Sequence, residues 1–385
     1  MTIRTAAALL AVALLAPPAN AEIAVSANDV KMQLVNGVGT VVENPPADSI
    51  TIIDLGRSPP AVLAELPVPT SLAGPPLSVA ITPDESLALV TAAMKLDPAD
   101  PRKLVPDNRL SVIDLKASPP AVIATLEAGK SAAGVSINRQ GTLALVANRA
   151  EGTVSVFGID GRTVKPLGKV TIADEKSGVS HVAIAPDGRS ALVTRDGDSK
   201  ISVLAIDGTD VTYTKRDISA GLRPYGVDVS SRGDIAVVAN IGTGSGDADT
   251  ISVIDMQAKP PRVVDTLTVG QTPEGIKMSP DGRHVAVVVM NGSNKPEGSP
   301  FRNDNGKLVV FKVDGRKLSR LGEVPIGHWS QGVAFSRDGR TILVQNIVEK
   351  NIQVLRLEGD TLTDTGQKIA LTGGGAAIRT ADLPQ

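Results

Sequence analysis

The sequence predicts an all-β fold, a seven-bladed β-propeller of four-stranded antiparallel blades, on three observations. First, an apolar run, a tight turn, a second run, a polar loop and a third run recur along the chain, most clearly in residues 181–207. This order is typical of three antiparallel strands. Second, the first turns of the copies lie 45 to 57 residues apart, at Pro83-Asp84, Gln140-Gly141, Asp187-Gly188, Arg232-Gly233, Asp281-Gly282 and Asp338-Gly339. Third, a further apolar run such as 121–126 or 263–269 completes each copy, and four-stranded repeats at this spacing indicate a propeller.

The seventh blade is predicted from the two ends of the chain taken together. Residues 22–28 match second strands and residues 49–55 match third strands, but no first strand precedes them. Residues 372–380 match first strands such as 331–337, and no second strand follows them. We therefore expect the C-terminal strand to pair with the N-terminal blade and close the ring, which leaves no free sheet edge.

The chain begins with a predicted secretory signal peptide, residues 1–21. It has one basic residue, Arg4, then an apolar stretch from Ala6 to Ala16, and it ends in a small-residue pattern at Ala19-Asn20-Ala21. The apolar stretch is shorter than the roughly 20 residues that a membrane span requires. We expect cleavage near Ala21 and a periplasmic or secreted product, with residues 22–385 forming one propeller domain.

Composition excludes several classes of function. The chain has no cysteine, so thiolate nucleophiles, disulfides and thiolate metal sites are excluded. It has 39 basic and 41 acidic residues without long runs of one sign, and only 2% aromatic residues, which is unlike a nucleic-acid surface. No second apolar stretch is long enough to span a membrane, and we expect a monomer without a cofactor.

The predicted blades follow one another in a single register. Blade 1 joins residues 22–66 to the C-terminal strand, and blades 2 to 7 cover about 77–127, 133–170, 181–218, 225–269, 274–324 and 331–369.

Several second strands end in asparagine, at Asn28, Asn148, Asn240, Asn291 and Asn346. We attribute this asparagine to its tolerance of left-handed backbone and to bonding within its own turn. With Thr250-Ile-Ser-Val-Ile-Asp255 and Thr153-Val-Ser-Val-Phe157 downstream, the chain resembles the YVTN-repeat propellers over nearly all of residues 22–385. The resemblance implies an architecture and hardly any chemistry.

Polar residues gather where the predicted inner strands of blades 4 to 7 begin. Strand direction alternates within a blade, so the connections into first strands and those between second and third strands emerge on one face, which we call the mouth face. We predict ligand-binding residues there, around the central channel: His181, Arg223, Tyr225, Glu274, His328, Trp329 and Gln331. The alternative is that these groups line a channel that holds only water. His284 follows a turn on the opposite face, and we expect it to be solvated.

Three second-to-third connections are long, at residues 29–48, 94–108 and 292–306. They lie in blades around the closure, and we expect them either to form a lid or docking rim or to be tolerated insertions. The Asp/Asn spacings at Asp196-Gly-Asp198, Asp247-Ala-Asp249 and Asn303-Asp-Asn-Gly306 resemble parts of calcium loops. None is complete and turns favour the same residues, so we predict no metal site.

The predicted function is a binding module for a small molecule or a periplasmic protein at the mouth face. The alternative comes from a resemblance to lactonase-type propellers, which implies a hydrolase or isomerase using His181, Arg223 and Glu274. In that case Arg223 holds a substrate carboxylate, Glu274 or His181 moves a proton, and His328 polarises a carbonyl. The lactonase signature places Pro-Arg-His or Pro-His before the inner strand, and only Ser180-His181 approaches it.

Overall fold

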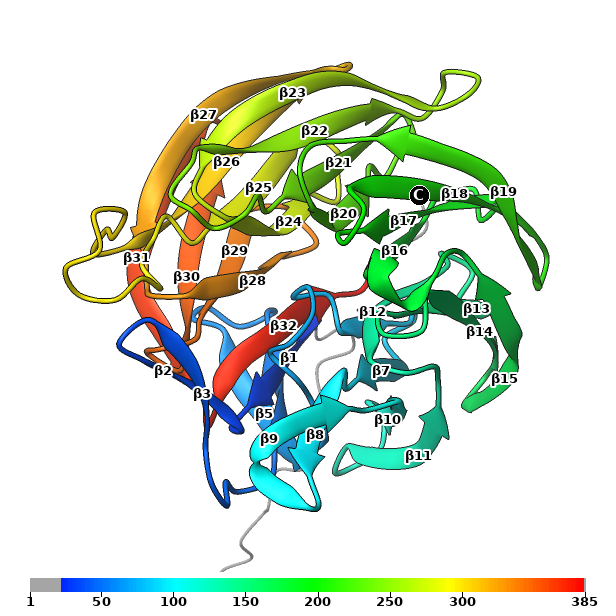
Figure 1. Cartoon of the computed structure of the whole chain (residues 1–385), viewed down its shortest axis with the longest axis horizontal. Coiled ribbons are helices and arrows are strands. Elements are labelled where there is room, and N and C mark those ends of the chain that lie inside the picture. The colour runs from blue at the N-terminus through cyan, green and yellow to red at the C-terminus, as the bar shows by residue number, and fades with distance from the viewer. Residues whose placement is uncertain (1–21, 384–385) are drawn as a thin grey trace, which may run out of the picture.

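The computed structural model describes residues 22–383, and the predicted signal peptide lies outside them. Seven four-stranded antiparallel sheets stand around a central axis (Figure 1), which confirms the predicted propeller. Within residues 22–383, no helix is long and apolar enough to cross a membrane.

Each blade runs from an innermost strand at the channel to an outermost strand at the rim. In that order, blades 1 to 4 are β32 (Gly374–Thr380), β1 (Ile23–Asp29), β4 (Ser49–Asp54) and β5 (Ala61–Pro67); β6 (Val79–Ile81), β7 (Leu87–Thr91), β10 (Arg109–Asp114) and β11 (Ala121–Glu127); β12 (Ala132–Ile137), β13 (Leu143–Asn148), β14 (Thr153–Asp160) and β15 (Thr163–Thr171); and β16 (Val179–Ile184), β17 (Ser190–Arg195), β18 (Lys200–Asp207) and β19 (Asp210–Ser219). Blades 5 to 7 are β20 (Pro224–Val229), β21 (Ile235–Asn240), β22 (Asp249–Asp255) and β23 (Arg262–Gly270); β24 (Pro273–Met278), β25 (His284–Val289), β26 (Gly306–Asp314) and β27 (Lys317–Ile326); and β28 (Ser330–Phe335), β29 (Thr341–Asn346), β30 (Asn351–Glu358) and β31 (Thr361–Ala370). A short 3-10 helix, Glu175–Ser177, precedes β16.

The ring closes as predicted, because β32 pairs antiparallel with β1. Ala27 lies opposite Ala377 and Val25 opposite Arg379. Figure 1 shows the C-terminal strand, in red, beside the N-terminal strand, in blue. The first and last segments of the chain thus share one sheet.

The core lies between neighbouring blades. Seven apolar clusters, each built mainly from two adjacent blades, fill the seven interfaces. Valine, isoleucine, leucine and alanine dominate these clusters, because β-branched and small side chains pack well on pleated surfaces. Burial of this apolar area is the main stabilising term.

Four inner strands carry glycine at their third position, Gly134, Gly226, Gly275 and Gly332. A Cβ at Gly275 would lie 1.9 Å from the Gln331 carbonyl oxygen, and one at Gly226 would lie 2.6 Å from that of Glu274. These glycines let the next inner strand approach closely. In blade 4 the equivalent residue is His181. The pairing of β16 with β17, in which His181 lies opposite Thr194, establishes this equivalence.

The repeated asparagine has a different role from the one predicted. Asn148 Nδ2 donates to Thr153 Oγ1 and Ser155 Oγ, both at 2.9 Å, and Asn240 donates in the same way to Thr250 and Ser252. Of the five asparagines only Asn291 has a positive φ. Asn291 lies beyond the end of β25 and donates instead to the Asn305 carbonyl oxygen, at 3.1 Å. The other four asparagines link the second strand to the third, which explains the Thr-x-Ser pattern downstream.

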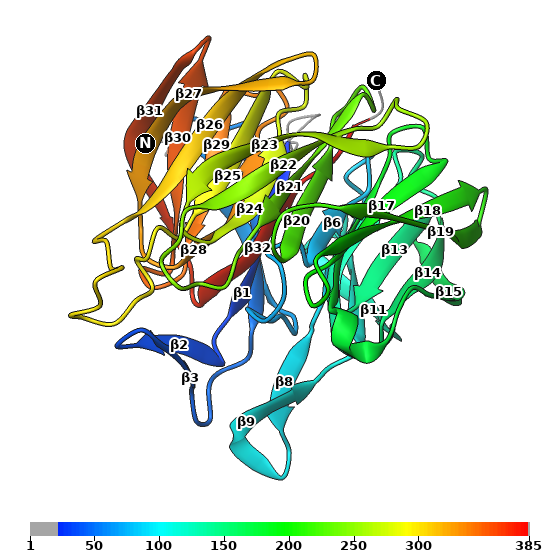
Figure 2. The same cartoon turned by 45° about the horizontal axis from the view of Figure 1, so that its top comes forward.

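Two of the three long connections contain hairpins that the sequence did not predict. They are β2 (Met32–Val35) with β3 (Val38–Val41), and β8 (Met94–Asp97) with β9 (Asp100–Pro106). Both project from the ring on the same face (Figure 2). Hairpin β2–β3 touches the long connection of blade 6, where Glu297 N donates to Asn36 Oδ1 at 3.1 Å. These segments form a raised rim beside the channel.

Candidate functional site

The residue just before an inner strand has left-handed backbone in five blades: Ser131, Gly178, Arg223, Thr272 and Trp329, with φ between 50° and 62°. In the first four of these residues, the carbonyl accepts a hydrogen bond from the residue that follows the second strand, as in Ile241 N to Arg223 O at 3.1 Å. Because this geometry recurs around the ring, it belongs to the repeat. The left-handed backbone at Arg223 and Trp329 fixes the direction in which their side chains leave the main chain.

On the mouth face one buried carboxylate binds two arginines. The Asp196 side chain is 2% exposed and accepts from Arg149 at 2.8 Å and from Arg223 at 3.1 Å. Ser180 Oγ also donates to Asp196, at 2.5 Å. The arginine side chains remain 37% and 39% exposed, so both guanidinium groups keep donors available to a ligand. The three groups together carry one net positive charge.

Glu274 lies beside these arginines, at the second position of β24. It is 8% exposed, and its Oε2 has no hydrogen-bond partner among the described residues. Burial raises the pKa of Glu274 to about 8, because the nearby Arg223 and Arg149 only partly offset the cost of desolvation and Asp196 adds to the shift. At neutral pH Glu274 is therefore mainly a neutral hydrogen-bond donor.

Other polar groups near the starts of the inner strands also lack partners. Ser78 Oγ and Gln331 Oε1 are buried and make no hydrogen bond within residues 22–383. Tyr225 is 7% exposed, and burial together with Glu274 raises the pKa of its hydroxyl, which stays protonated. Buried polar atoms without protein partners are expected to bind water or a ligand.

The remaining predicted mouth residues have protein partners. His328 Nδ1 lies 2.5 Å from Glu349 Oε1, and the two side chains are 33% and 28% exposed. Trp329 packs against the apolar cluster of blades 1 and 2, and its backbone N–H donates to Ser293 Oγ at 3.1 Å. Arg223 and Glu274 are neighbours, but the ion-pair partner of Arg223 is Asp196.

His181 lies in a different part of the channel from Arg223 and Glu274. It lines a cavity of about 50 Å³ toward the face that carries the first-to-second strand turns, which we call the turn face. Val227 N donates to its Nδ1 at 3.4 Å. Burial, with the positive charges of Arg379 and Lys277, lowers the pKa of His181 well below its ordinary value, so the ring is neutral.

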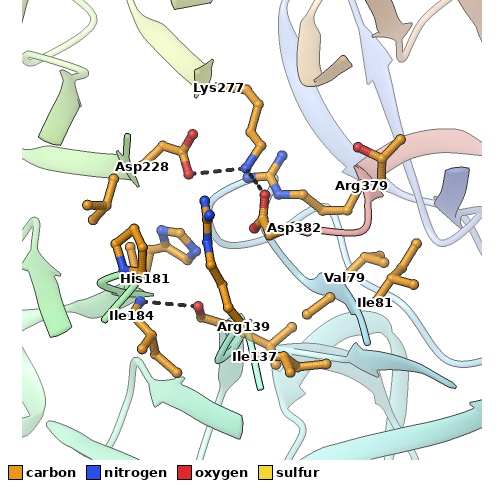
Figure 3. A pocket seen from close by; sticks show the side chains of 17 residues that line it. Val79, Ile81, Ile137, Arg139, His181, Ile184, Asp228, Lys277, Arg379 and Asp382 are labelled. Carbon is orange, nitrogen blue, oxygen red and sulfur yellow. Dashed lines mark hydrogen bonds and ion pairs between the residues drawn. The ribbon is translucent and has the colours of Figure 1, made fainter. Parts of the chain in front are cut away.

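Five charged residues converge with His181 on this turn-face cavity: Arg139, Asp228, Lys277, Arg379 and Asp382 (Figure 3). Sequence analysis did not single them out. Asp228 and Lys277 are fifth in β20 and β24, and Arg379 is sixth in β32. All three occupy the same register position against the second strand, and this position is uncharged in the other four blades. Alignment of the seven inner strands by register would have revealed these three charged residues at one position.

His284 corrects another expectation, because its side chain is only 13% exposed and its Nε2 lies 3.9 Å from Asp360. The first turn of blade 6 therefore packs against blade 7 and keeps the imidazole from being solvated.

Comparisons with known proteins establish the fold. No family model matches the sequence, and no curated protein matches it. A Pseudomonas aeruginosa periplasmic gluconolactonase is similar in structure, with TM-score 0.67 and 17% identity over 95% of this chain and 100% of that one. So is a Bacteroides fragilis protein provisionally assigned as a 6-phosphogluconolactonase, with TM-score 0.71 and 15% identity over 95% and 100%. A Desulfotomaculum acetoxidans protein of unknown function has TM-score 0.70 and 16% identity over 94% and 100%. The chain thus shares its architecture with lactonase-like propellers.

Proposed function

We propose that this protein is a periplasmic ligand-binding propeller that holds a small sugar acid, or its lactone, at the mouth face. One observation carries the proposal: a buried carboxyl group, Glu274, with an unpartnered oxygen lies beside two half-exposed guanidinium groups. Two structural neighbours support the choice of ligand class, one described as a gluconolactonase and one provisionally assigned as a 6-phosphogluconolactonase.

Each group has a distinct role in the proposed complex. Arg149 and Arg223 donate to the ligand carboxylate, since the planar guanidinium suits bidentate pairing. Asp196 holds the two arginines in place and reduces their mutual repulsion. Protonated Glu274 donates a hydrogen bond to a ligand oxygen, and Gln331 offers its free Oε1 to a ligand hydroxyl.

Lactone hydrolysis is the alternative function at the same site. A carboxyl group with a pKa of about 8 is suited to proton transfer near neutral pH. His181 lines the turn-face cavity, so in this alternative Glu274 is the proton-transfer group at the mouth. Glu274→Gln would then abolish turnover of D-glucono-δ-lactone, and an unchanged rate would remove this alternative.

Thermal-shift titration with D-gluconate and D-glucono-δ-lactone tests the binding function. We expect the wild type to be stabilised, and Arg223→Ala and Arg149→Ala to lose that stabilisation. Arg232→Ala is the matched control, because Arg232 is similarly exposed, at 42%, and also pairs with an aspartate. No shift for the wild type, or equal shifts for Arg223→Ala and Arg232→Ala, would refute the proposal.

The location and the repeat class are part of the proposal. The residues before Glu22 have the pattern of a signal peptide, and the Asn–Thr–Ser contacts between second and third strands support a YVTN-type repeat. Fractionation of an expressing bacterium should place the protein in the periplasm with Glu22 at its N-terminus. Recovery from the cytoplasm with Met1 intact would contradict this location.

A further inference from the structure

The turn-face cavity has an excess of positive charge. Arg139, Lys277 and Arg379 face two carboxylates, Asp228 and Asp382, while His181 is neutral. Asp228 belongs to the wall of the cavity, since its Oδ2 accepts from Met278 N at 2.8 Å and its Oδ1 from Lys277 at 3.2 Å. Without Asp382 the cavity would hold three cations and one anion.

Asp382 enters this cavity from the segment that follows β32. Its Oδ1 accepts from Lys277 Nζ at 2.8 Å. The Lys277 side chain is 8% exposed, but that of Asp382 is 55% exposed. The Asp382 carboxylate therefore contacts the buried Lys277 from the solvent side. The segment that carries Asp382 does not cover this carboxylate.

Two of the three cations are not neutralised by wall residues. Within residues 22–383, the Arg139 side chain makes no hydrogen bond or ion pair, and Figure 3 shows it reaching between His181 and Asp382. Arg379 Nη1 donates only to carbonyl oxygens, those of Val333 at 3.0 Å and Ile378 at 3.1 Å. His181 accepts at Nδ1, so the proton of its neutral ring lies on Nε2. The cavity thus offers several donors to an anion.

From this arrangement we infer that the turn-face cavity is a second binding site, for a compact carboxylate, and that Asp382 is an intramolecular ligand occupying it. An external carboxylate takes the place of the Asp382 side chain against Lys277 and also engages Arg139. This site lies toward the face opposite the proposed sugar-acid site and is independent of it.

The local charges and space favour a compact carboxylate over a larger anion. Desolvation raises the pKa of Asp382, but the positive charges of Lys277, Arg379 and Arg139 lower it by more. The site therefore stabilises an ionised carboxylate. Asp382 also borders an outer hollow of about 280 Å³, so its departure would join that hollow to the cavity.

Isothermal titration calorimetry with malonate at pH 7 and low ionic strength tests this inference. A tethered competitor acts at an effective concentration of the order of millimolar. We therefore expect Asp382→Ala and Asp382→Asn to bind malonate about tenfold more tightly than the wild type. Arg139→Gln in the Asp382→Ala background should abolish binding.

Two controls separate this site from others. Arg283→Gln removes an arginine that is 76% exposed near the turn of blade 6 and should leave malonate binding unchanged. Arg223→Ala should also leave it unchanged, because Arg223 belongs to the mouth-face site. Both Asp382 variants should unfold cooperatively, since Lys277 retains Asp228.

Several results would overturn the inference. Equal affinities of the wild type and both Asp382 variants would show that Asp382 does not compete. Absence of malonate binding to both folded variants, or its retention after Arg139→Gln, would remove the site. Loss of binding in Arg223→Ala would place the anion at the mouth face.

Discussion

At the residue scale, Glu274 differs from the other carboxylates of the mouth face. Asp196 is also buried, but it accepts hydrogen bonds from Arg149, Arg223 and Ser180. Glu274 has an oxygen without a partner in the described part of the chain. Because an ionised carboxylate is costly in such a place, Glu274 retains its proton well above the ordinary carboxyl range.

The raised pKa of Glu274 predicts how stability depends on pH. The unfolded carboxyl titrates near 4.5 and the folded one at about 8, so between these values the folded state binds the proton more tightly. Relative to Glu274→Gln, the wild type should lose up to about 1.4 kcal/mol of unfolding free energy per pH unit as pH rises from 5 to 8. Urea unfolding of both proteins at pH 5, 6.5 and 8 measures the difference. Parallel profiles would contradict the buried, protonated state.

At the element scale, the inner strands fix the spacing of the blades. Glycine at the third position of four inner strands removes the side chain where the next strand passes. The same position carries His181 in blade 4, where its ring lies against Gly134 of blade 3. One register position thus sets both the packing of the ring and the placement of a channel histidine.

Gly275→Ala tests this packing. The added methyl carbon would lie 1.9 Å from a backbone oxygen, which cannot move without shifting β28. We expect a loss of about 3 kcal/mol in unfolding free energy, at the upper end for overpacked sites. Gly322→Ala is the control, because a Cβ there meets no atom within 4 Å and its φ is not positive; it should change stability by less than about 0.5 kcal/mol. Equal effects of the two changes would show that the glycine layer is not needed for close packing.

The register also explains how much of the site the sequence could predict. The periodic pattern of apolar runs and turns was sufficient to predict the seven blades and the closure of the ring. Arg223 and Glu274 were placed together correctly, because both lie near the starts of adjacent inner strands. His181 was grouped with them, but it stands one strand position further along than Glu274, and a one-residue step reverses the direction of a side chain. Asp382 follows the last strand, and no local pattern indicates that it folds back into the channel.

At the scale of the whole molecule, the ring depends on one strand from the C-terminus. β32 pairs with β1 along its length, and its side chains pack in the clusters on both sides of blade 1. It also supplies Arg379 to the turn-face cavity. The last segment of the chain therefore contributes to closure, to the core and to a charged site.

Two truncations distinguish the contribution of β32 to ring closure from that of the residues that follow β32. Removal of residues 373–385 should abolish the cooperative thermal transition, because it exposes the edge of β1 and opens two blade interfaces. Removal of residues 382–385 leaves β32 in place and should preserve the transition. Calorimetry of both truncated proteins makes the comparison. A cooperative transition of the shorter protein near that of the intact chain would contradict closure by β32.

The pH dependence of ligand affinity tests the proposed function most directly, because it links the ligand to Glu274 itself. Calorimetric titration of D-gluconate should give a constant affinity from pH 6 to 7.5 and a fall of about tenfold per pH unit above the pKa of about 8, where ionised Glu274 repels the ligand carboxylate. Glu274→Gln keeps a hydrogen-bond donor without a titrating group, and its affinity should stay constant to pH 9. A wild-type profile that is flat to pH 9, or that matches the profile of Glu274→Gln, would contradict a sugar-acid site at the mouth face.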